Sequence, residues 1–313
     1  MLESRQTELE RRYGMHRLMI IFIALALGIL PHAELCAKDI KLWHRTSVYQ
    51  DGKDGPLSNP EGVACSADAH LIVSDSGNGR LLRFRIDVET AMVESKEIKL
   101  SQLTHPTKIQ LGRNGEMYVL NRKPLRIVRL TADGKFISVV KPAGRTAMVP
   151  KSFAVHPSGN LYVLDLAARK VLVMTSGGAV RAGIDFPAGT EFLSDITVDS
   201  KGRVLTVDGV AGIVYAMDDG DRSFAPLTES LKPYVRYPSA LTTDPGGRIF
   251  LSDRNGSRIL VLSHGGGFLG RLSGRGWKEG LLQYPSQICL NRRGRLSVAD
   301  TLNSRIQVFE VSN

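Results

Sequence analysis

A unit of about 45 residues recurs six times along this chain of 313 residues. The starts of the units are 46, 44, 43, 45 and 47 residues apart, at Pro60, Pro106, Pro150, Leu193, Pro238 and Pro285. Fifteen residues after each start comes an Asp or Asn, at Asp75, Asn121, Asp165, Asp208, Asp253 and Asp300. Self-similarity at a fixed period of this length indicates a repeat architecture in which each unit is one supersecondary element.

Each unit consists of short apolar runs separated by turn residues, a pattern typical of antiparallel strands. In the last unit, residues 286–290, 296–299 and 305–309 read as three strands, and the first turn runs from Asn291 to Gly294. Four antiparallel strands in about 45 residues make one propeller blade. The sequence therefore predicts an all-β fold over residues 38–313, a six-bladed β-propeller of four-stranded antiparallel blades.

The last unit ends after its third predicted strand, so its fourth strand has to come from elsewhere. Residues 40–49 precede the first unit and have a strand-like composition. We predict that this N-terminal segment completes the last blade, because that pairing leaves no open sheet edge. The alternative is a leader that pairs with nothing.

The repeated residues resemble the NHL repeat. The clearest copies are residues 284–309, which include Val298-Ala299-Asp300, and residues 59–80, which include Asp75 and Arg80. The resemblance covers residues 38–313 and implies the six-bladed propeller fold. The unit that begins at Leu193 departs from the pattern, since it lacks both the Pro and the Arg. Because the Asp and the Arg recur in most units, we interpret them as residues that maintain the blade.

The N-terminus has the order of a secretory signal. Arginines precede thirteen uncharged residues, Leu18–Leu30, and small residues follow at Ala33 and Ala37. A helix of that length spans roughly 20 Å and is too short for a bilayer core of about 30 Å. We predict a signal peptide over residues 1–37, with Met15 as a possible true start, and export to the periplasm or the extracellular space. The alternative is an uncleaved signal that anchors the chain in the membrane.

The residues that differ between units point to the functional site. Three residues after each start the side chain is apolar, so we expect that parity to pack between blades and the opposite parity to face the central channel. Propeller ligand sites usually gather where the inner strands begin. The candidates there are Glu61, Lys108, Lys151, Asp195 and Gln287, flanked by Arg122 and Arg254.

Mixed charges without clustered metal ligands favour recognition over bond cleavage. We expect a binding scaffold for a protein, an anionic glycan or another envelope component, acting as a monomer with no catalytic residue, cofactor, metal or membrane span in the mature chain. His105 and two separated carboxylates, Glu61 and Asp195, are a poor set of Zn²⁺ or Ca²⁺ ligands. One alternative is a metal-dependent lactonase- or lyase-like enzyme in the channel, as in some six-bladed relatives. Another is an RNA-binding propeller, which the net charge of +10 favours and export opposes.

Two further features concern the inner strands and their far ends. Cys65 and Cys289 lie at opposite parities of the first and last inner strands, and we interpret both as free buried thiols. The first hairpin turns of the last three units carry a basic cluster that is either a solvated rim or a docking patch: Lys201, Arg203, Arg248, Arg292, Arg293 and Arg295.

Overall fold

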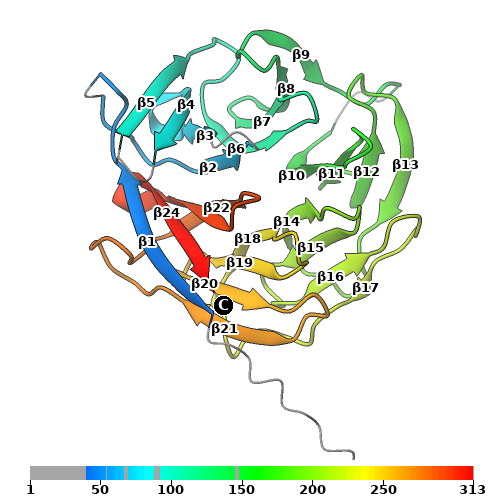
Figure 1. Ribbon diagram of the computed structural model, residues 1–313. Coiled ribbons are helices and arrows are strands. Elements are labelled where there is room, and N and C mark those ends of the chain that lie inside the picture. Colours follow the sequence, from blue (N-terminus) through cyan, green and yellow to red (C-terminus); the bar gives the residue numbers. More distant parts are fainter. Residues whose placement is uncertain (1–39, 54, 67–69, 88–91, 145–147, 313) are drawn as a thin grey trace, which may run out of the picture. The chain divides into compact units, whose positions relative to one another are not determined.

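The computed structural model describes residues 40–53, 55–66, 70–87, 92–144 and 148–312. These residues form six four-stranded antiparallel sheets arranged in a ring, with the first strand of each repeat nearest the centre (Figure 1). The predicted all-β, six-bladed propeller is confirmed. The signal predicted for residues 1–37 lies outside the described residues. No helix in the described ranges is both long and apolar enough to cross a membrane.

Each repeat forms one blade, and we number the blades from the first repeat. Blade 1 contains β2 (Gly62–Cys65), β3 (His70–Asp75), β4 (Arg80–Asp87) and β5 (Met92–Ile98). Blade 2 contains β6 (Pro106–Leu111), β7 (Met117–Arg122), β8 (Leu125–Leu130) and β9 (Phe136–Val140). Blade 3 contains β10 (Pro150–Val155), β11 (Leu161–Asp165), β12 (Lys170–Met174) and β13 (Val180–Asp185).

The remaining blades follow the same order. Blade 4 contains β14 (Leu193–Val198), β15 (Val204–Asp208), β16 (Val214–Met217) and β17 (Ala225–Pro226). Blade 5 contains β18 (Pro238–Thr243), β19 (Ile249–Asp253), β20 (Arg258–Leu262) and β21 (Phe268–Leu272). Blade 6 contains β22 (Pro285–Leu290), β23 (Arg295–Asp300) and β24 (Arg305–Ser312), and its outer strand is β1 (Lys41–Val48).

The N-terminal strand closes the ring as the sequence predicts. β1 pairs with β24 in antiparallel fashion, from Lys41 opposite Ser312 to Val48 opposite Ile306. In Figure 1 the blue strand β1 lies beside the red strand β24. The last blade therefore has four strands like the others, and the N-terminal strand is joined to the C-terminal strands in one sheet.

The repeated Asp or Asn holds the chain where it enters each inner strand. Its side-chain oxygen accepts a hydrogen bond from a backbone N–H one or two residues before the repeat start. The donor–acceptor distances are 2.7 Å in blade 1, 2.8 Å in blade 2, 2.9 Å in blade 3, 2.6 Å in blade 4, 2.9 Å in blade 5 and 2.6 Å in blade 6. The Arg five residues later pairs directly in blades 1 and 6, where Arg80 and Arg305 lie 2.7 Å from Asp75 and Asp300. The structural interpretation of these residues is confirmed.

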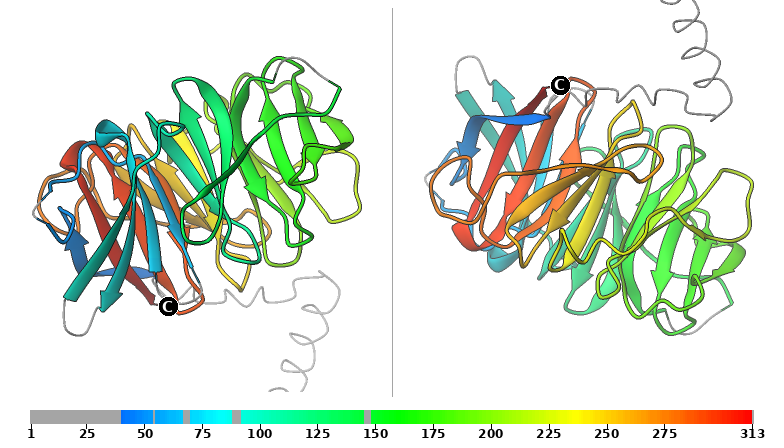
Figure 2. Two further views of the ribbon diagram at one scale, coloured as in Figure 1. Left: turned by 90° about the horizontal axis from the view of Figure 1, so that it is seen from above. Right: turned by 90° about the horizontal axis from the view of Figure 1, so that it is seen from below.

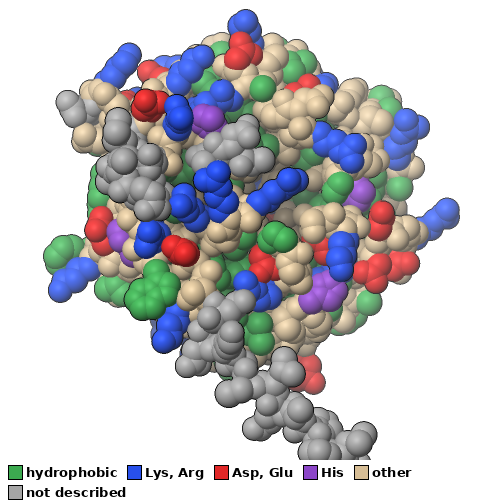
Figure 3. All heavy atoms as spheres, in the orientation of Figure 1, with side chains coloured by type: hydrophobic (Ala, Val, Ile, Leu, Met, Phe, Trp, Pro, Cys, Tyr) green, Lys and Arg blue, Asp and Glu red, His purple; other side chains and the backbone are tan. Residues whose placement is uncertain are grey.

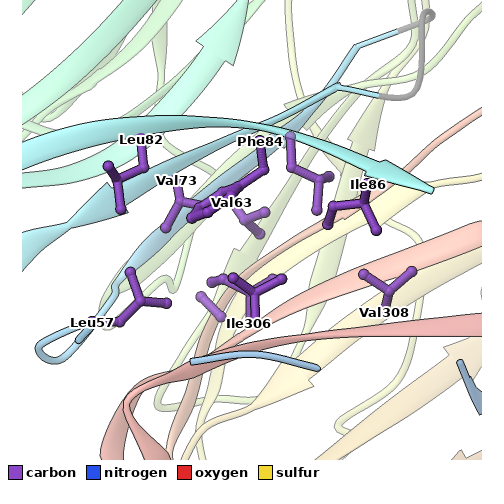
Figure 4. Packing of buried hydrophobic residues seen from close by; sticks show 11 residues of the cluster. Leu57, Val63, Val73, Leu82, Phe84, Ile86, Ile306 and Val308 are labelled. Atoms are coloured by element: carbon purple, nitrogen blue, oxygen red, sulfur yellow. The ribbon is translucent and has the colours of Figure 1, made fainter. Parts of the chain in front are cut away.

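Both faces of every blade pack against a neighbour, which corrects the expected parity rule. Val63 on β2 packs toward Ile306 and Val308 of blade 6 (Figure 4). The next residue, Ala64, packs on the other face toward Ile109 of blade 2. Side chains of one parity therefore face the preceding blade and those of the other parity face the following blade. The residues near the strand starts line a cavity at one end of the axis, and residues further along the inner strands line a second cavity at the other end.

The same geometry joins the two cysteines, so the prediction of free thiols is wrong. Cys65 and Cys289 form a disulfide between β2 and β22, with their Cα atoms 5.7 Å apart. Cys65 lies on the face of blade 1 that contacts blade 6, and Cys289 lies on the facing side of blade 6. Where the inner strands of two neighbouring blades face each other, one strand contributes the odd-numbered positions counted from its repeat start and the other contributes the even-numbered ones. Cys65, at position five, and Cys289, at position four, therefore lie on facing surfaces.

The ring has two distinct ends. We call the end where the inner strands β2, β6, β10, β14, β18 and β22 begin the mouth. Since β24 runs in the same direction as β22, it finishes at the other end, which we call the opposite face. The side views show the blades standing next to one another (Figure 2).

Candidate functional site

The mouth contains a cavity of about 230 Å³ that all seven predicted ligand-binding residues line. Every blade contributes at least one of them: Glu61, Lys108, Arg122, Lys151, Asp195, Arg254 and Gln287. The cavity walls also carry a group of hydroxyl side chains and an apolar strip. The sequence argument that symmetry-breaking residues gather at the strand starts is thus consistent with the observed geometry.

A local irregularity explains why two successive residues of an inner strand face the cavity. The ladder register shifts directly after the first residue of β6, β10, β14 and β18. Such bulges leave one residue unpaired and re-aim its side chain. In blade 3 the unpaired residue is Lys151, and both Lys151 and Ser152 line the cavity.

The floor of the cavity contains an ion pair that crosses the ring. The Nζ of Lys108 donates to Oδ1 of Asp195 at 2.5 Å, to Oγ of Ser152 at 2.9 Å and to the carbonyl of Ile196 at 2.8 Å. The second carboxylate oxygen of Asp195 accepts from the backbone N–H of Leu241 at 3.0 Å. Burial lowers the pKa of Lys108, and the charge of Asp195 acts against that shift. All three donors of Lys108 are used within the protein, so its role is to hold blades 2 to 5 together.

Gln287 completes the floor from the other side of the ring. Its Oε1 accepts from the backbone N–H groups of Val63 at 3.2 Å and Ile109 at 3.0 Å, and its Nε2 donates to the carbonyl of Ile109 at 2.7 Å. Gln287 is therefore a tie between blades 6, 1 and 2. Together, Lys108, Asp195 and Gln287 link every blade across the axis.

This floor separates the mouth cavity from a second cavity of about 560 Å³ at the opposite face. Among the described residues, Gln287 alone lines both. The side chains of Lys108, Asp195 and Gln287 therefore mark the inner end of the mouth cavity.

At the rim, Glu61 is neutralised by its neighbours. Arg122 donates two hydrogen bonds to the carboxylate of Glu61, at 3.0 Å and 2.6 Å, in the two-point geometry that favours Arg–carboxylate pairs. His105 Nε2 lies 3.5 Å from the same carboxylate. Glu61 and Arg122 thus form a closed pair at the edge of the pocket.

Two cations in the pocket have no such partner. Within the described part of the chain, neither Lys151 nor Arg254 forms a hydrogen bond or an ion pair through its side chain, and the Nε of Arg254 is buried without an acceptor. Each instead lies over an aromatic ring: Lys151 Nζ is 4.9 Å from the centroid of Phe192, and the Arg254 guanidinium is 4.7 Å from that of Tyr284. Such stacking stabilises a cation weakly and leaves its N–H donors unused.

Lys151 lies in a partly desolvated site near charges of both signs. Burial lowers the pKa of Lys151, and the charges of Arg122 and Arg254 lower it further, while Asp195 and Glu61 act in the opposite direction. The cavity holds four cationic side chains and two carboxylates, both of which are already paired. Two positive charges in the pocket, those of Lys151 and Arg254, therefore have no oppositely charged partner among the described residues.

The hydroxyl groups of the pocket are already used as donors. The side chains of Ser194, Ser239 and Ser286 donate to backbone carbonyls, and Ser152 donates to Asp195. Thr107 likewise donates to the carbonyl of Leu120. The side-chain N–H groups of Lys151 and Arg254 donate to no described residue, so they are available to a ligand.

The aromatic residues beneath these cations were not among the sequence candidates. Phe192 and Tyr284 each stand one residue before a repeat start, and Tyr237 and His105 occupy the same place in two other repeats. A ring at this position in four of six repeats is the signal that could have found them. It places a flat apolar surface at the mouth on which a neighbouring cation can rest.

The pocket does not fit a divalent metal ion. Among the described residues, no group of three or more His, Cys, Asp or Glu side chains gathers closely enough to bind one. Both carboxylates of the cavity are occupied by cationic side chains. A further divalent cation would also meet the excess positive charge of Lys151 and Arg254, which opposes binding.

Some side chains of the basic cluster at the opposite face form ion pairs within the protein. Arg203 lies 3.4 Å from Asp199 and donates to the carbonyl of His264, and Arg248 lies 2.5 Å from Asp244. Arg292 and Arg293 are exposed. Figure 3 views this face and shows Lys and Arg side chains around the centre of the ring.

Comparisons with known proteins agree on the fold. The solved structure of virginiamycin B lyase from Staphylococcus aureus matches with a TM-score of 0.61 and 13% identity, over 87% of this chain and 99% of that one. A gluconolactonase from Xanthomonas campestris matches with a TM-score of 0.62 and 19% identity, over 90% of this chain and 94% of that one. At these identities the likeness is one of fold alone.

The sequence comparisons reach less far. Protein brain tumor of Drosophila melanogaster is 26% identical over 134 residues, which is 41% of this chain and 12% of that protein. No protein-family model matches the sequence. The chain is thus a six-bladed β-propeller with structural neighbours among lyases and gluconolactonases.

Proposed function

We propose that this chain is an exported NHL-type propeller that works as a binding scaffold and captures a protein or glycan partner through an anionic group seated in the mouth cavity. The observation that carries the proposal is that Lys151 and Arg254 have no hydrogen-bonding or ion-pairing partner among the described residues, in a cavity whose carboxylates and hydroxyls are already engaged. Cations without partners in a partly desolvated pocket bind an anion more strongly than exposed cations do, because solvent screens them less.

Export is supported by two independent features. The apolar run Leu18–Leu30 has the length and the flanking residues of a secretory signal. The Cys65–Cys289 disulfide is of a kind that persists in oxidising compartments and is rare in the cytosol. A cationic exported protein meets polyanions and acidic proteins at the cell envelope, in keeping with an anionic partner.

A lactonase- or lyase-like activity is the second candidate, and the structural neighbours favour it. Solved structures that share the fold include a lyase and a gluconolactonase. The described pocket lacks a set of metal ligands, and its carboxylates are held in ion pairs. Since one fold hosts many chemistries, the residues of the site weigh more than the fold. They support binding.

The test is partner capture from an envelope extract by three forms of the mature protein: wild type, the mouth variant Lys151→Gln/Arg254→Gln, and the control Arg292→Gln/Arg293→Gln at the opposite face. We expect the mouth variant to lose capture and the control to keep it. If capture is lost only in the control variant, the binding surface lies at the opposite face and the proposal for the mouth is wrong. Metal-dependent lactone hydrolysis by the wild type would replace the scaffold function with an enzymatic one, and capture abolished by ribonuclease would identify an RNA partner.

A further inference from the structure

We propose that the mouth cavity is built for a phosphomonoester dianion that carries an apolar substituent. This inference rests on the proposed function, namely that an anionic group binds at the mouth, and it names the class of that group. It follows from the two cations without an oppositely charged partner, from the N–H donors that they carry and from the apolar residues beside them.

The charge balance favours a dianion over a monoanion. The Lys108–Asp195 and Glu61–Arg122 pairs are each neutral, which leaves two positive charges on Lys151 and Arg254. A carboxylate would neutralise one of them and leave the other unpaired in a partly buried site. A phosphomonoester carries a charge of about −1.5 to −2 at pH 7 and neutralises both.

The two donors match the geometry of a phosphoryl group. A Lys ammonium is a point charge with three N–H donors, and an Arg guanidinium is a planar fork that contacts two oxygens at once. A phosphomonoester offers three terminal oxygens to them. Phe192 and Tyr284 contact the cations at centroid distances of 4.9 Å and 4.7 Å, and neither cation donates a side-chain hydrogen bond to a described residue.

A neutral sugar finds fewer partners in this pocket. Its hydroxyls need donors and acceptors, whereas the serines that line the cavity already donate to protein oxygens. The acceptors of Glu61 and Asp195 are likewise directed at Arg122 and Lys108. The described residues of the pocket are therefore better suited to bind a charged group than a neutral sugar.

One wall of the pocket is apolar and belongs to blades 2 and 3. Leu120, Leu125, Pro150 and Leu166 line this side of the cavity. Leu125 is 43% exposed, so part of its side chain is open to contact at this wall. An apolar ester group placed on this strip would be removed from water while its phosphate contacts Lys151 and Arg254.

The pH dependence of binding separates the phosphomonoester from other anions. Its second ionisation has a pKa of about 6, so the dianion forms between roughly pH 5 and 7. At alkaline pH, Lys151 loses its proton earlier than an ordinary lysine, because burial and the charges of Arg122 and Arg254 lower its pKa despite Asp195 and Glu61. Affinity should therefore rise from pH 5 to 7 and fall again at alkaline pH.

The experiment is calorimetric titration of the mature protein with phenyl phosphate and with benzoate, which share an apolar ring and differ in charge. At pH 7.5 we expect phenyl phosphate to bind at least roughly tenfold more tightly, and at pH 5 we expect this advantage to shrink. Lys151→Gln and Arg254→Gln should each weaken phenyl phosphate binding by roughly tenfold or more, as expected for a lost charge-assisted hydrogen bond. Arg292→Gln at the opposite face is the matched control and should leave the affinity unchanged.

Two further probes identify the natural source of the phosphate. Glucose 6-phosphate represents a soluble sugar phosphate, and vesicles that contain phosphatidic acid represent a lipid headgroup. Tighter binding of the vesicles, lost in Lys151→Gln, would assign the site to a lipid. Tighter binding of the sugar phosphate would assign it to a soluble ligand or a glycan. Either result supports the phosphomonoester class.

The negative outcomes distinguish this inference from the proposed function. Equal affinity for benzoate and phenyl phosphate, with both weakened in Lys151→Gln, would refute the dianion and leave an anion-binding mouth in place. Failure of every phosphate probe, while partner capture still depends on Lys151 and Arg254, would also refute the dianion. If neither the probes nor partner capture depended on these two residues, the proposed function would fail as well.

Discussion

The ammonium of Lys108 in β6 lies 2.5 Å from a carboxylate oxygen of Asp195 in β14, so that blade 2 is bonded to blade 4 past the intervening blade. Ser152 of that intervening blade donates to the same carboxylate oxygen at 2.5 Å. Both charged side chains are buried, with exposures of 8% for Lys108 and 4% for Asp195. Removing one partner would leave the other as an uncompensated charge inside the ring.

The first prediction concerns this pair. Lys108→Met should lower the free energy of unfolding by about 3–5 kcal/mol, because the carboxylate of Asp195 remains buried without its cation. Lys108→Met/Asp195→Asn should recover most of that loss, since the amide is neutral and its oxygen can still accept from the backbone of Leu241. Denaturant titration of the three proteins provides the measurement. A cost below about 1 kcal/mol for Lys108→Met would show that the pair is solvated.

The second prediction concerns the disulfide. Reduction, or Cys65→Ser/Cys289→Ser, should lower the free energy of unfolding by about 2–5 kcal/mol, because the bond joins residues 224 apart and restricts the unfolded chain. Denaturant unfolding with and without reductant measures the difference. The serine variant should be insensitive to reductant, which is the internal control. Peptide mapping that recovers both cysteines as free thiols from native protein would contradict the prediction.

The third prediction concerns ring closure by β1. Deleting residues 40–50 should lower the melting temperature and promote self-association, because β24 would then present an unpaired edge. Size-exclusion chromatography and thermal unfolding report the two effects. A monomer with an unchanged melting temperature would mean that β1 contributes no stability.

The fourth prediction concerns Lys151. Its pKa is lowered in the folded state, chiefly by burial, so its positive charge destabilises the fold at neutral pH. Lys151→Met keeps the contact with Phe192, removes the charge and should be more stable than the wild type at pH 7. The advantage should shrink as pH rises through the lowered pKa of Lys151 towards the unfolded value of about 10.4, because the wild type then gains stability. Lower stability of Lys151→Met at pH 7 would contradict this account.

The fifth prediction concerns export. The native protein should lack about the first 37 residues of the printed sequence and occur outside the cytoplasm, because Leu18–Leu30 reads as a signal segment. N-terminal sequencing of protein from fractionated cells is the measurement. A soluble cytoplasmic protein that begins at Met1 or Met15 would refute export.

The fold was predictable because its signals are local and repeated. The spacing of Asp75 and its counterparts gave the blades, and the strand missing from the last blade pointed to β1. The positions of Lys108, Lys151 and Asp195 at the strand starts were predictable for the same reason. Each of these inferences needs only the register of a strand and the order of the chain.

The contacts that the sequence did not predict depend on how far a side chain reaches across the ring. Lys108 looked like a free ligand-binding lysine, yet all three of its N–H groups are used inside the protein. Its partner Asp195 lies 87 residues away, and no local pattern couples them. Cys65 and Cys289 were judged by parity within one sheet, whereas the relevant surface lies between two sheets. The contact of Lys151 with Phe192 likewise joins neighbouring blades.

The pairing of β1 with β24 has a consequence for the order of folding during synthesis. Blades 1 to 5 consist of consecutive strands and can form as the chain emerges. Blade 6 joins Lys41 to Ser312, so its outer strand must wait, with an open edge, until nearly the whole chain is available. Contacts of such long sequence separation form late and slowly. A chain that is translocated before it folds would therefore assemble its ring, its disulfide and its mouth pocket only after crossing the membrane.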